Sequence, residues 1–247
     1  MIDCVSAQRV DPLAPVTILG CLQADERARL ARSCRLRAFP AGASVIGEDR
    51  DGREVLFVLE GRVRVIGRSE GGRLVSFAEI GAGGHVGEIA ALDDGPRTAE
   101  VEAITDCRVA ILSPGTFDAL LHRRPCIAVA LLRQLARIIR TADLRITELS
   151  TLGAAERLAR ELLRRAQPSA TGDGVSVVEP MPTQEHLASV TGATRETVAR
   201  LLAQLQHAGL TRRSGSRLTI LDMARLGAIA GGRRPGPATS PVTVDHA

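Results

Sequence analysis

The stretch CIAVALLRQLARIIRTADLRITEL, residues 126–149, predicts one long helix and decides the organisation of the chain. Its apolar side chains recur in alternating steps of four and three residues, which is the a/d pattern of a coiled-coil seam. The seam positions are Ala128, Leu132, Leu135, Ile139, Ala142, Ile146 and Leu149. Pro125 precedes the helix, where its fixed φ suits a helix start. We expect the seam to pack against a second copy of the chain, and the alternative is the core helix of a monomer.

Composition limits the class of protein. The 247 residues are 45% hydrophobic, which is enough for one large domain or two small ones. The sequence has no apolar run of about 18 residues and no apolar segment near its start, so we expect a cytoplasmic protein without a membrane partner. The net charge is +4, and residues 151–230 hold 10 Arg against 7 acidic residues, which is compatible with nucleic-acid contact.

The five cysteines give no metal or disulfide signature. They are Cys4, Cys21, Cys34, Cys107 and Cys126, and no pair has C-x-x-C spacing. We therefore expect no metal site and no disulfide framework, but buried or half-buried thiols in a reducing compartment.

Before the long helix, short β-rich runs alternate with turn residues. A helix is expected at 22–34, and strands at 44–46, 54–59, 62–66, 73–80, 99–103 and 108–112. Turn signals stand at Gly61, at Asp51-Gly52 and at Gly71-Gly72. Regular short strands with such turns predict an antiparallel sandwich or barrel.

After the long helix the pattern is mainly helical. Helices are expected at 152–166, 184–190 and 195–207, with a loop at 167–174, a strand at 175–178 and a hairpin from strands 210–212 and 217–221. Gly209 is the expected glycine beyond the end of the last helix. A C-terminal tail rich in Gly and Pro is expected to be disordered.

The helices at 184–190 and 195–207 predict a helix-turn-helix. Thr183 and Thr194 are placed to cap them, and Gly192 supplies the positive φ of a tight turn. The second helix opens with Thr194, Arg195, Glu196, Thr197 and then Arg200. Arginine can bind guanine bidentately and glutamate can accept from cytosine, so this helix could read base edges.

The following hairpin would be a wing whose arginines touch phosphates. These arginines are Arg212, Arg213 and Arg217. The alternative is an ordinary helical hairpin with a solvated arginine face.

A second dense stretch lies at residues 83–99. A glycine-rich backbone leads into Gly87, Glu88 and Ile89, and Arg97 and Thr98 follow. Backbone N–H groups and a guanidinium suit a phosphate, and a carboxylate suits a sugar hydroxyl. These features favour a cyclic nucleotide, and the alternative is a surface turn with a Glu–Arg ion pair.

The chain resembles the catabolite-activator (cyclic AMP receptor protein)/FNR superfamily of transcription regulators over roughly residues 22–224. Gly87-Glu88 with Leu92, followed by Arg97-Thr98-Ala99, resembles the phosphate-binding cassette, and residues 194–200 resemble the recognition helix. The resemblance implies an α+β fold with a cyclic-nucleotide-binding, jelly-roll-like β-roll, a dimerisation helix and a winged helix-turn-helix. The implied segments are an N-terminal extension at 1–21, the β-roll at 22–125, the helix at 126–150, the DNA-binding domain at 151–226 and a disordered tail at 227–247.

The resemblance also implies roles for individual residues. Glu88 would bind the ribose 2′-hydroxyl, Arg97 the cyclic phosphate, and Thr98 the phosphate or purine. Arg195, Glu196 and Arg200 would read a TGTGA-like half-site on double-stranded DNA, twice across a palindrome, in a homodimer that works with RNA polymerase.

The sequence departs from the cyclic AMP receptor at the base. Where that family member offers a Thr-Ser pair, a gapless match gives Ala142 and Asp143, preceded by Thr141. A carboxylate can accept from guanine N1–H and N2–H₂, and Thr98 is typical of cyclic GMP-binding relatives, so cyclic GMP is favoured. Adenine could also donate to Asp143, so cyclic AMP stays open.

The favoured function is thus a non-enzymatic, cyclic-nucleotide-responsive transcription regulator. Three alternatives remain: a strictly cyclic AMP-dependent regulator, a redox-sensing regulator with a vestigial cassette, and a cyclic nucleotide-binding regulatory subunit of an enzyme.

Overall fold

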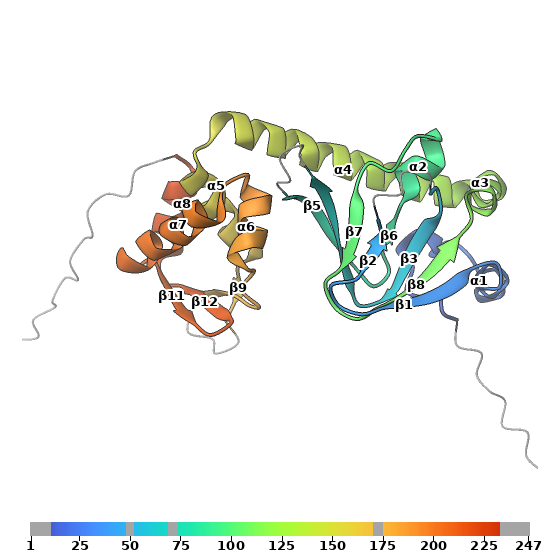
Figure 1. Cartoon of the computed structure of the whole chain (residues 1–247), viewed down its shortest axis with the longest axis horizontal. Helices are drawn as coiled ribbons and strands as arrows, with labels where there is room; N and C mark the ends of the chain where they lie inside the picture. The colour runs from blue at the N-terminus through green and yellow to red at the C-terminus, as the bar shows by residue number, and fades with distance from the viewer. Residues whose placement is uncertain (1–10, 48–51, 69–73, 170–174, 233–247) are drawn as a thin grey trace, which may run out of the picture. The chain divides into compact units, whose positions relative to one another are not determined.

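The computed structural model describes residues 11–47, 52–68, 74–169 and 175–232. The chain divides into two compact units, residues 1–141 and 142–247, and each is described by itself (Figure 1). The first unit is rich in antiparallel strands and the second is mainly helical, with the long helix α4 (Pro125–Thr151) contributing to both. The predicted α+β fold, a β domain followed by a long helix and a helix-turn-helix domain, is therefore confirmed.

Two four-stranded antiparallel sheets build the first unit. One has the order β1-β8-β3-β6 and the other β2-β7-β4-β5. The strands of the first sheet are β1 (Arg35–Phe39), β3 (Val55–Glu60), β6 (His85–Val86) and β8 (Cys107–Leu112). Those of the second are β2 (Ser44–Ile46), β4 (Arg62–Arg68), β5 (Leu74–Gly81) and β7 (Glu100–Ala103). Gly61, at φ +81°, makes the expected turn between β3 and β4, where a Cβ would meet the carbonyl of Asp106 at 2.2 Å.

Strand β3 explains how the unit holds two apolar cores. Its residues Val55 to Leu59 are all buried, so both of its faces are covered. Leu56 and Val58 join Val63, Val101 and other inward residues of both sheets. Val55, Phe57 and Leu59 face a second core formed with the N-terminal segment and helices.

The N-terminal segment is part of that second core rather than a separate extension. Its buried side chains are Leu13, Val16, Ile18, Leu19 and Leu22, around the 3-10 turn η1 (Thr17–Leu19). They pack with Phe117 of α3 (Pro114–Arg123) and with Ile127 and Leu131 of α4. The domain boundary expected at residue 22 stays a prediction, although side chains on both sides of it share this core. Helix α1 (Ala24–Ala31) follows, as predicted.

Most predicted strands occur within two residues of their expected limits, and two strands of the first unit were missed. Strand β1 is exposed except at Phe39, and β6 has only two residues. Strand β6 is too short to show a pattern, whereas β1 alternates polar and apolar residues from Arg35 to Ala38, a signal that was overlooked. The turn signals expected at Asp51-Gly52 and Gly71-Gly72 fall at least partly outside the described residues.

The predicted long helix is confirmed as α4. Most of its apolar seam is exposed to solvent. Ile127 and Leu131 are buried, on a different face from the seam. Four seam side chains are largely exposed: Leu132 at 65%, Ile139 at 60%, Ile146 at 63% and Leu149 at 52%.

The second unit joins the end of α4 to four helices and a small sheet. The helices are α5 (Ala154–Arg165), α6 (Gln184–Thr191), α7 (Arg195–His207) and α8 (Met223–Ala230). The sheet has the order β11-β12-β10-β9, with β9 (Gln167–Pro168), β10 (Ser176–Val178), β11 (Thr211–Ser214) and β12 (Arg217–Ile220). Two expectations are corrected here. Strand β9 opens the segment expected as a loop at 167–174, and α8 covers residues 227–230 of the expected tail, with Ala230 buried.

The cysteines differ from the prediction. Cys21 and Cys126 form a disulfide between positions 105 residues apart in sequence. Cys34 is half-buried and Cys107 is buried, and both are free, as expected for them. Cys4 lies outside the described residues.

Candidate ligand site and nucleic-acid interface

The candidate ligand site is a sharp turn between β6 and the short helix α2 (Glu88–Asp93). Gly87 stands at the N-cap of α2 with φ 88°, in the left-handed region that glycine adopts at least cost. A Cβ at Gly87 would lie 2.5 Å from Arg97 Nη1 and 2.6 Å from the Glu54 carbonyl oxygen. The turn therefore requires glycine for both conformation and space.

Arg97 is held against this turn. Its side chain is 6% exposed, with Nη1 donating to the Gly87 carbonyl at 2.9 Å and Nη2 to the Glu54 carbonyl at 2.8 Å. Nη2 also lies 3.6 Å from the Glu54 carboxylate. Glu54 is a site residue that the sequence did not reveal, since it lies 43 positions from Arg97.

Glu88 is the buried acid of the site. Burial raises the pKa of its carboxyl, while hydrogen bonding to its own backbone N–H and the charge of Arg97 oppose that shift. Glu88 and Arg97 are thus brought together at one turn, with Ile89 and Thr98 exposed beside them.

His85, two residues before Gly87, is also buried. It is 1% exposed, and desolvation lowers its pKa to about 4. The imidazole is therefore neutral over the physiological range.

Thr141 and Asp143 lie on the exposed part of α4. The Thr141 hydroxyl donates to the Arg137 carbonyl at 3.0 Å, which leaves its lone pairs as acceptors. The two residues fall in different units, Thr141 in the first and Asp143 in the second.

The helix-turn-helix is built by local caps and a glycine. The Thr183 hydroxyl accepts from the His186 N–H at 3.1 Å, and the Thr194 hydroxyl accepts from the Thr197 N–H at 3.2 Å. Gly192, at φ 63°, ends α6 in the left-handed conformation. Leu187, Val198, Leu202 and Leu205 are buried in the core of the unit.

The start of α7 presents charged side chains to solvent. Arg195, Glu196 and Arg200 are exposed. Hydrogen bonds from its own backbone N–H and from Thr194 lower the pKa of Glu196, so the carboxylate is ionised and can act as an acceptor. The capping residues Thr183 and Thr194 are likewise exposed.

The three wing arginines differ in the contacts that their side chains make within the protein. Arg212 is exposed, and Arg213 Nε donates to the Gly215 carbonyl at 3.3 Å. Arg217 pairs with the Glu179 carboxylate at 2.7 Å. Of the three, Arg217 is therefore the least available to a phosphate.

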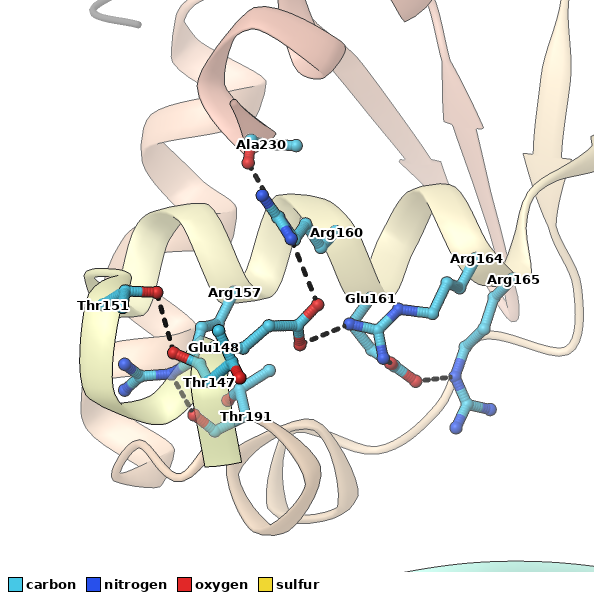
Figure 2. Close-up of polar contacts among 10 residues, drawn as sticks. All are labelled: Thr147, Glu148, Thr151, Arg157, Arg160, Glu161, Arg164, Arg165, Thr191 and Ala230. Atoms are coloured by element: carbon cyan, nitrogen blue, oxygen red, sulfur yellow. Dashed lines mark hydrogen bonds and ion pairs between the residues drawn. The ribbon is translucent and has the colours of Figure 1, made fainter. Parts of the chain in front are cut away.

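An arginine–carboxylate network ties the end of α4 to the helix-turn-helix within the second unit. Figure 2 shows Glu148 between two arginines of α5, at 3.3 Å from Arg160 and 2.8 Å from Arg164. Arg157 donates to the Thr191 carbonyl at the end of α6 at 2.7 Å and also to the Leu152 carbonyl.

The same network continues to α6 and α8. Arg165 pairs with Glu161 at 2.6 Å and contacts His186 Nε2 at 2.8 Å. Because a guanidinium only donates, His186 Nε2 is an acceptor in this contact. Arg160 Nε donates to the Ala230 carbonyl at 2.8 Å, so α5 connects α4, α6 and α8 (Figure 2).

The described residues offer neither a metal cluster nor a membrane-spanning helix. Within that part of the chain, no group of three or more His, Cys, Asp or Glu residues is placed to hold a metal ion. None of the described helices is both long and apolar enough to cross a membrane.

Comparison with protein families matches both regions. Residues 36–124 match the cyclic nucleotide-binding domain, and residues 156–229 match the Crp-like helix-turn-helix domain. A cyclic nucleotide-binding domain joined to a DNA-binding domain defines a class of ligand-responsive transcription regulators.

Similar proteins extend over most of the chain. It is 33% identical to the CRP-like cAMP-activated global transcriptional regulator of Mycobacterium tuberculosis, over 76% of this chain and 84% of that protein. It is 32% identical to the cyclic AMP receptor protein of Thermus thermophilus, over 79% and 88%. The structure of the c-di-GMP-responsive regulator CLP of Xanthomonas campestris shares the fold, with a TM-score of 0.71 at 22% identity over 81% of this chain and all of that one.

The chain therefore belongs to the CRP family of cyclic-nucleotide-responsive DNA-binding transcription regulators. The predicted resemblance is confirmed, and the relatives it identifies are regulators rather than enzymes.

Proposed function

We propose that the chain is a homodimeric transcription regulator whose DNA binding is gated by a cyclic purine nucleotide. The observation that carries this proposal is the joining of Gly87, Glu88 and Arg97 at one buried turn. The proposed ligand residues are Gly87, Glu88, Ile89, Arg97, Thr98, Thr141 and Asp143. The protein would act in the cytoplasm with RNA polymerase, without a metal ion and without making or breaking a bond.

The cyclic phosphate would replace the present hydrogen-bond acceptors of the Arg97 guanidinium. A phosphate offers stronger, charge-assisted hydrogen bonds than the Gly87 and Glu54 carbonyls that Arg97 now binds. The Glu88 carboxylate would accept from the ribose 2′-hydroxyl. Ionised Glu88 costs free energy in its buried setting, and a hydroxyl donor would offset part of that cost.

We favour cyclic GMP as the ligand, with cyclic AMP as the second candidate. Asp143 accepts hydrogen bonds only, which suits the paired N1–H and N2–H₂ donors of guanine, and Thr98 stands exposed beside Arg97. Two relatives whose names identify them as cyclic AMP-responsive favour the second candidate.

The uncovered seam of α4 supports a homodimer. Leu132, Ile139, Ile146 and Leu149 are each at least half exposed, at heptad positions that a second copy of the helix would cover. Ile139→Glu should convert the protein to a monomer in analytical ultracentrifugation. The matched control is Ile138→Glu. Because this residue lies beside the seam, the variant should still form a dimer.

The dimer would present two copies of α7 to one face of double-stranded DNA. Recognition helices of such dimers read half-sites about one helical turn apart, so a palindrome of TGTGA-type half-sites is the proposed target. The proposed DNA residues are Thr183, Thr194, Arg195, Glu196, Thr197 and Arg200.

Calorimetric titration with 3′,5′-cyclic GMP and cyclic AMP, side by side, tests the ligand. Tighter cyclic GMP binding that Asp143→Ala weakens selectively is expected. Preference for cyclic AMP would transfer the proposal to the second candidate, and binding of neither would contradict nucleotide gating. A regulatory subunit of an enzyme would lack the steep salt dependence of DNA affinity that a regulator must show.

A further inference from the structure

Two exposed cysteines join the N-terminal segment to the first turn of α4. Cys21 lies between η1 and α1, and Cys126 is the second residue of α4. Both are exposed although they are bonded to each other, with their Cα atoms 6.5 Å apart. A small thiol or oxidant can therefore reach this bond from solvent.

The contacts around the bond hold the two cysteines close in either redox state. Leu19 and Leu22 on one side pack in the same core as Ile127 and Leu131 on the other. Glu26 of α1 forms an ion pair with Arg124, two residues before Cys126. Reduction would leave these contacts in place, so the thiols would remain within reach of re-oxidation.

The position of Cys126 in the first turn of α4 favours thiol–disulfide exchange at this residue. The positive end of a helix dipole stabilises an anion in the first turn, which favours the thiolate of a reduced Cys126 as the attacking group. Cys126 is not one of the seam positions, the first of which is Ala128. It therefore lies off the surface that a second copy would cover. The pair would stay accessible in a dimer.

The other described cysteines are placed differently. Cys107 is buried and its thiol contacts the carbonyl oxygens of Arg62 and Thr105. Cys34 is half-buried, and burial raises the pKa of its thiol to about 11, which keeps it protonated and slow to react.

We propose that Cys21 and Cys126 are a reversible thiol–disulfide switch that sets how firmly the first turn of α4 is held to the N-terminal segment. In oxidation by hydrogen peroxide, the two thiols lose two protons and two electrons, the sulfur–sulfur bond forms, and the peroxide becomes two water molecules. In reduction, a dithiol such as dithiothreitol attacks the bond, both thiols are restored, and the reagent leaves as a cyclic disulfide. The redox state of the medium would thereby act on the helix that carries the dimer seam.

The test uses the purified full chain without nucleotide or DNA, so its result is independent of the proposed function. The protein is reduced with dithiothreitol under native conditions, re-oxidised with hydrogen peroxide, and trapped with a maleimide before peptide mapping and thermal unfolding. We expect a peptide linking Cys21 and Cys126 that forms and disappears with these treatments. A cross-link closing a loop of this length should raise the Tm of the oxidised chain by about 5 °C or more.

Matched variants assign the effect. Cys21→Ser and Cys126→Ser should each abolish the difference in Tm between oxidised and reduced protein, while Cys34→Ser should keep it. Equal Tm values for the reduced parent and reduced variants would show that the substitutions leave the fold intact. The proposal is overturned if the linking peptide does not form, if dithiothreitol does not open it in the native protein, or if the Tm difference survives in Cys21→Ser.

Discussion

Charged side chains are buried at the turn around Gly87 and exposed at the start of α7. At the turn, the side chains of Arg97 and Glu88 are buried, and Arg97 is held by the carbonyl of Glu54, which is distant in sequence. At the start of α7, Arg195, Glu196 and Arg200 are exposed to solvent, on a helix that the Thr194 cap begins and buried apolar residues such as Val198 hold in place.

This difference fits the ligands proposed for the two surfaces, a cyclic nucleotide at the turn and DNA at the start of α7. A small ligand needs donors and acceptors fixed in advance in a largely desolvated site, since ordering them on binding would cost affinity. DNA is a large, charged surface that meets exposed side chains, which can adjust to base edges. Substitutions should therefore have larger effects at the buried turn than at the exposed helix.

Arg97→Ala is expected to have the largest effect. It removes the guanidinium proposed to bind the cyclic phosphate through charge-assisted hydrogen bonds, which should weaken nucleotide binding by about a hundredfold or more. Calorimetric titration measures the change. Arg53→Ala is the matched control, because Arg53 is exposed and pairs with Asp94 at 2.8 Å, and its affinity should stay near that of the parent. Equal affinities for Arg97→Ala and the parent would refute the assignment of the turn as the phosphate site.

His85 should make the stability of the first unit sensitive to acid. Its folded-state pKa of about 4 lies below the ordinary value of 6.5, so the unfolded chain takes up the proton first as the pH falls. Stability is then full above pH 6.5 and should drop by about 3 kcal/mol between pH 6.5 and 4.

Denaturant unfolding of the parent and of His85→Leu across that pH range measures this effect. The variant should lose the part of the pH dependence that His85 supplies. Parallel pH profiles for the two proteins would show that the imidazole is not held neutral by burial.

Arg195→Ala should have a smaller effect, confined to sequence recognition. Loss of the proposed bidentate contact with guanine should reduce affinity for the proposed TGTGA palindrome by about tenfold and leave non-specific binding nearly unchanged. Fluorescence anisotropy with specific and scrambled duplexes gives both affinities. Arg212→Ala in the wing is the comparison, since loss of a phosphate contact should weaken both duplexes alike. An Arg195→Ala protein that discriminates as well as the parent would show that α7 reads DNA differently.

Glu148→Gln should give the smallest change. It removes the charge that faces Arg160 and Arg164 but retains the shape of the side chain, so the second unit should lose about 1 kcal/mol of stability. Thermal unfolding measures this loss, and the exposed Glu185→Gln should show none. Unchanged stability in Glu148→Gln would mean that the network in Figure 2 contributes little to the attachment of α4 to α5.

The features that could be predicted from sequence are those with local signals. The a/d spacing predicted the long helix. The residues Thr183, Gly192 and Thr194 predicted the limits of the helix pair to within one residue. The grouping of Gly87, Glu88 and Arg97 was also recognisable, because they lie within eleven consecutive residues. Such signals depend on propensity and capping, which act over one or two turns.

The features that were missed depend on contacts between distant segments. Glu54 meets Arg97 across 43 positions, and Cys21 meets Cys126 across 105. Strand β1 alternates arginine with Leu36 and Ala38, but it is exposed except at Phe39 and depends on its pairing with β8. Helix α8 holds a glycine in its interior, which weakens the helical signal, and packing of Leu226 and Ala230 overrides that preference.

The most direct measurement is the affinity of the purified protein for a TGTGA palindrome with and without saturating cyclic nucleotide. Coupling between a ligand site and a DNA-reading helix pair predicts about tenfold or stronger tightening in the parent and no tightening in Arg97→Ala. The same DNA affinity for the parent with and without cyclic GMP or cyclic AMP would contradict nucleotide gating.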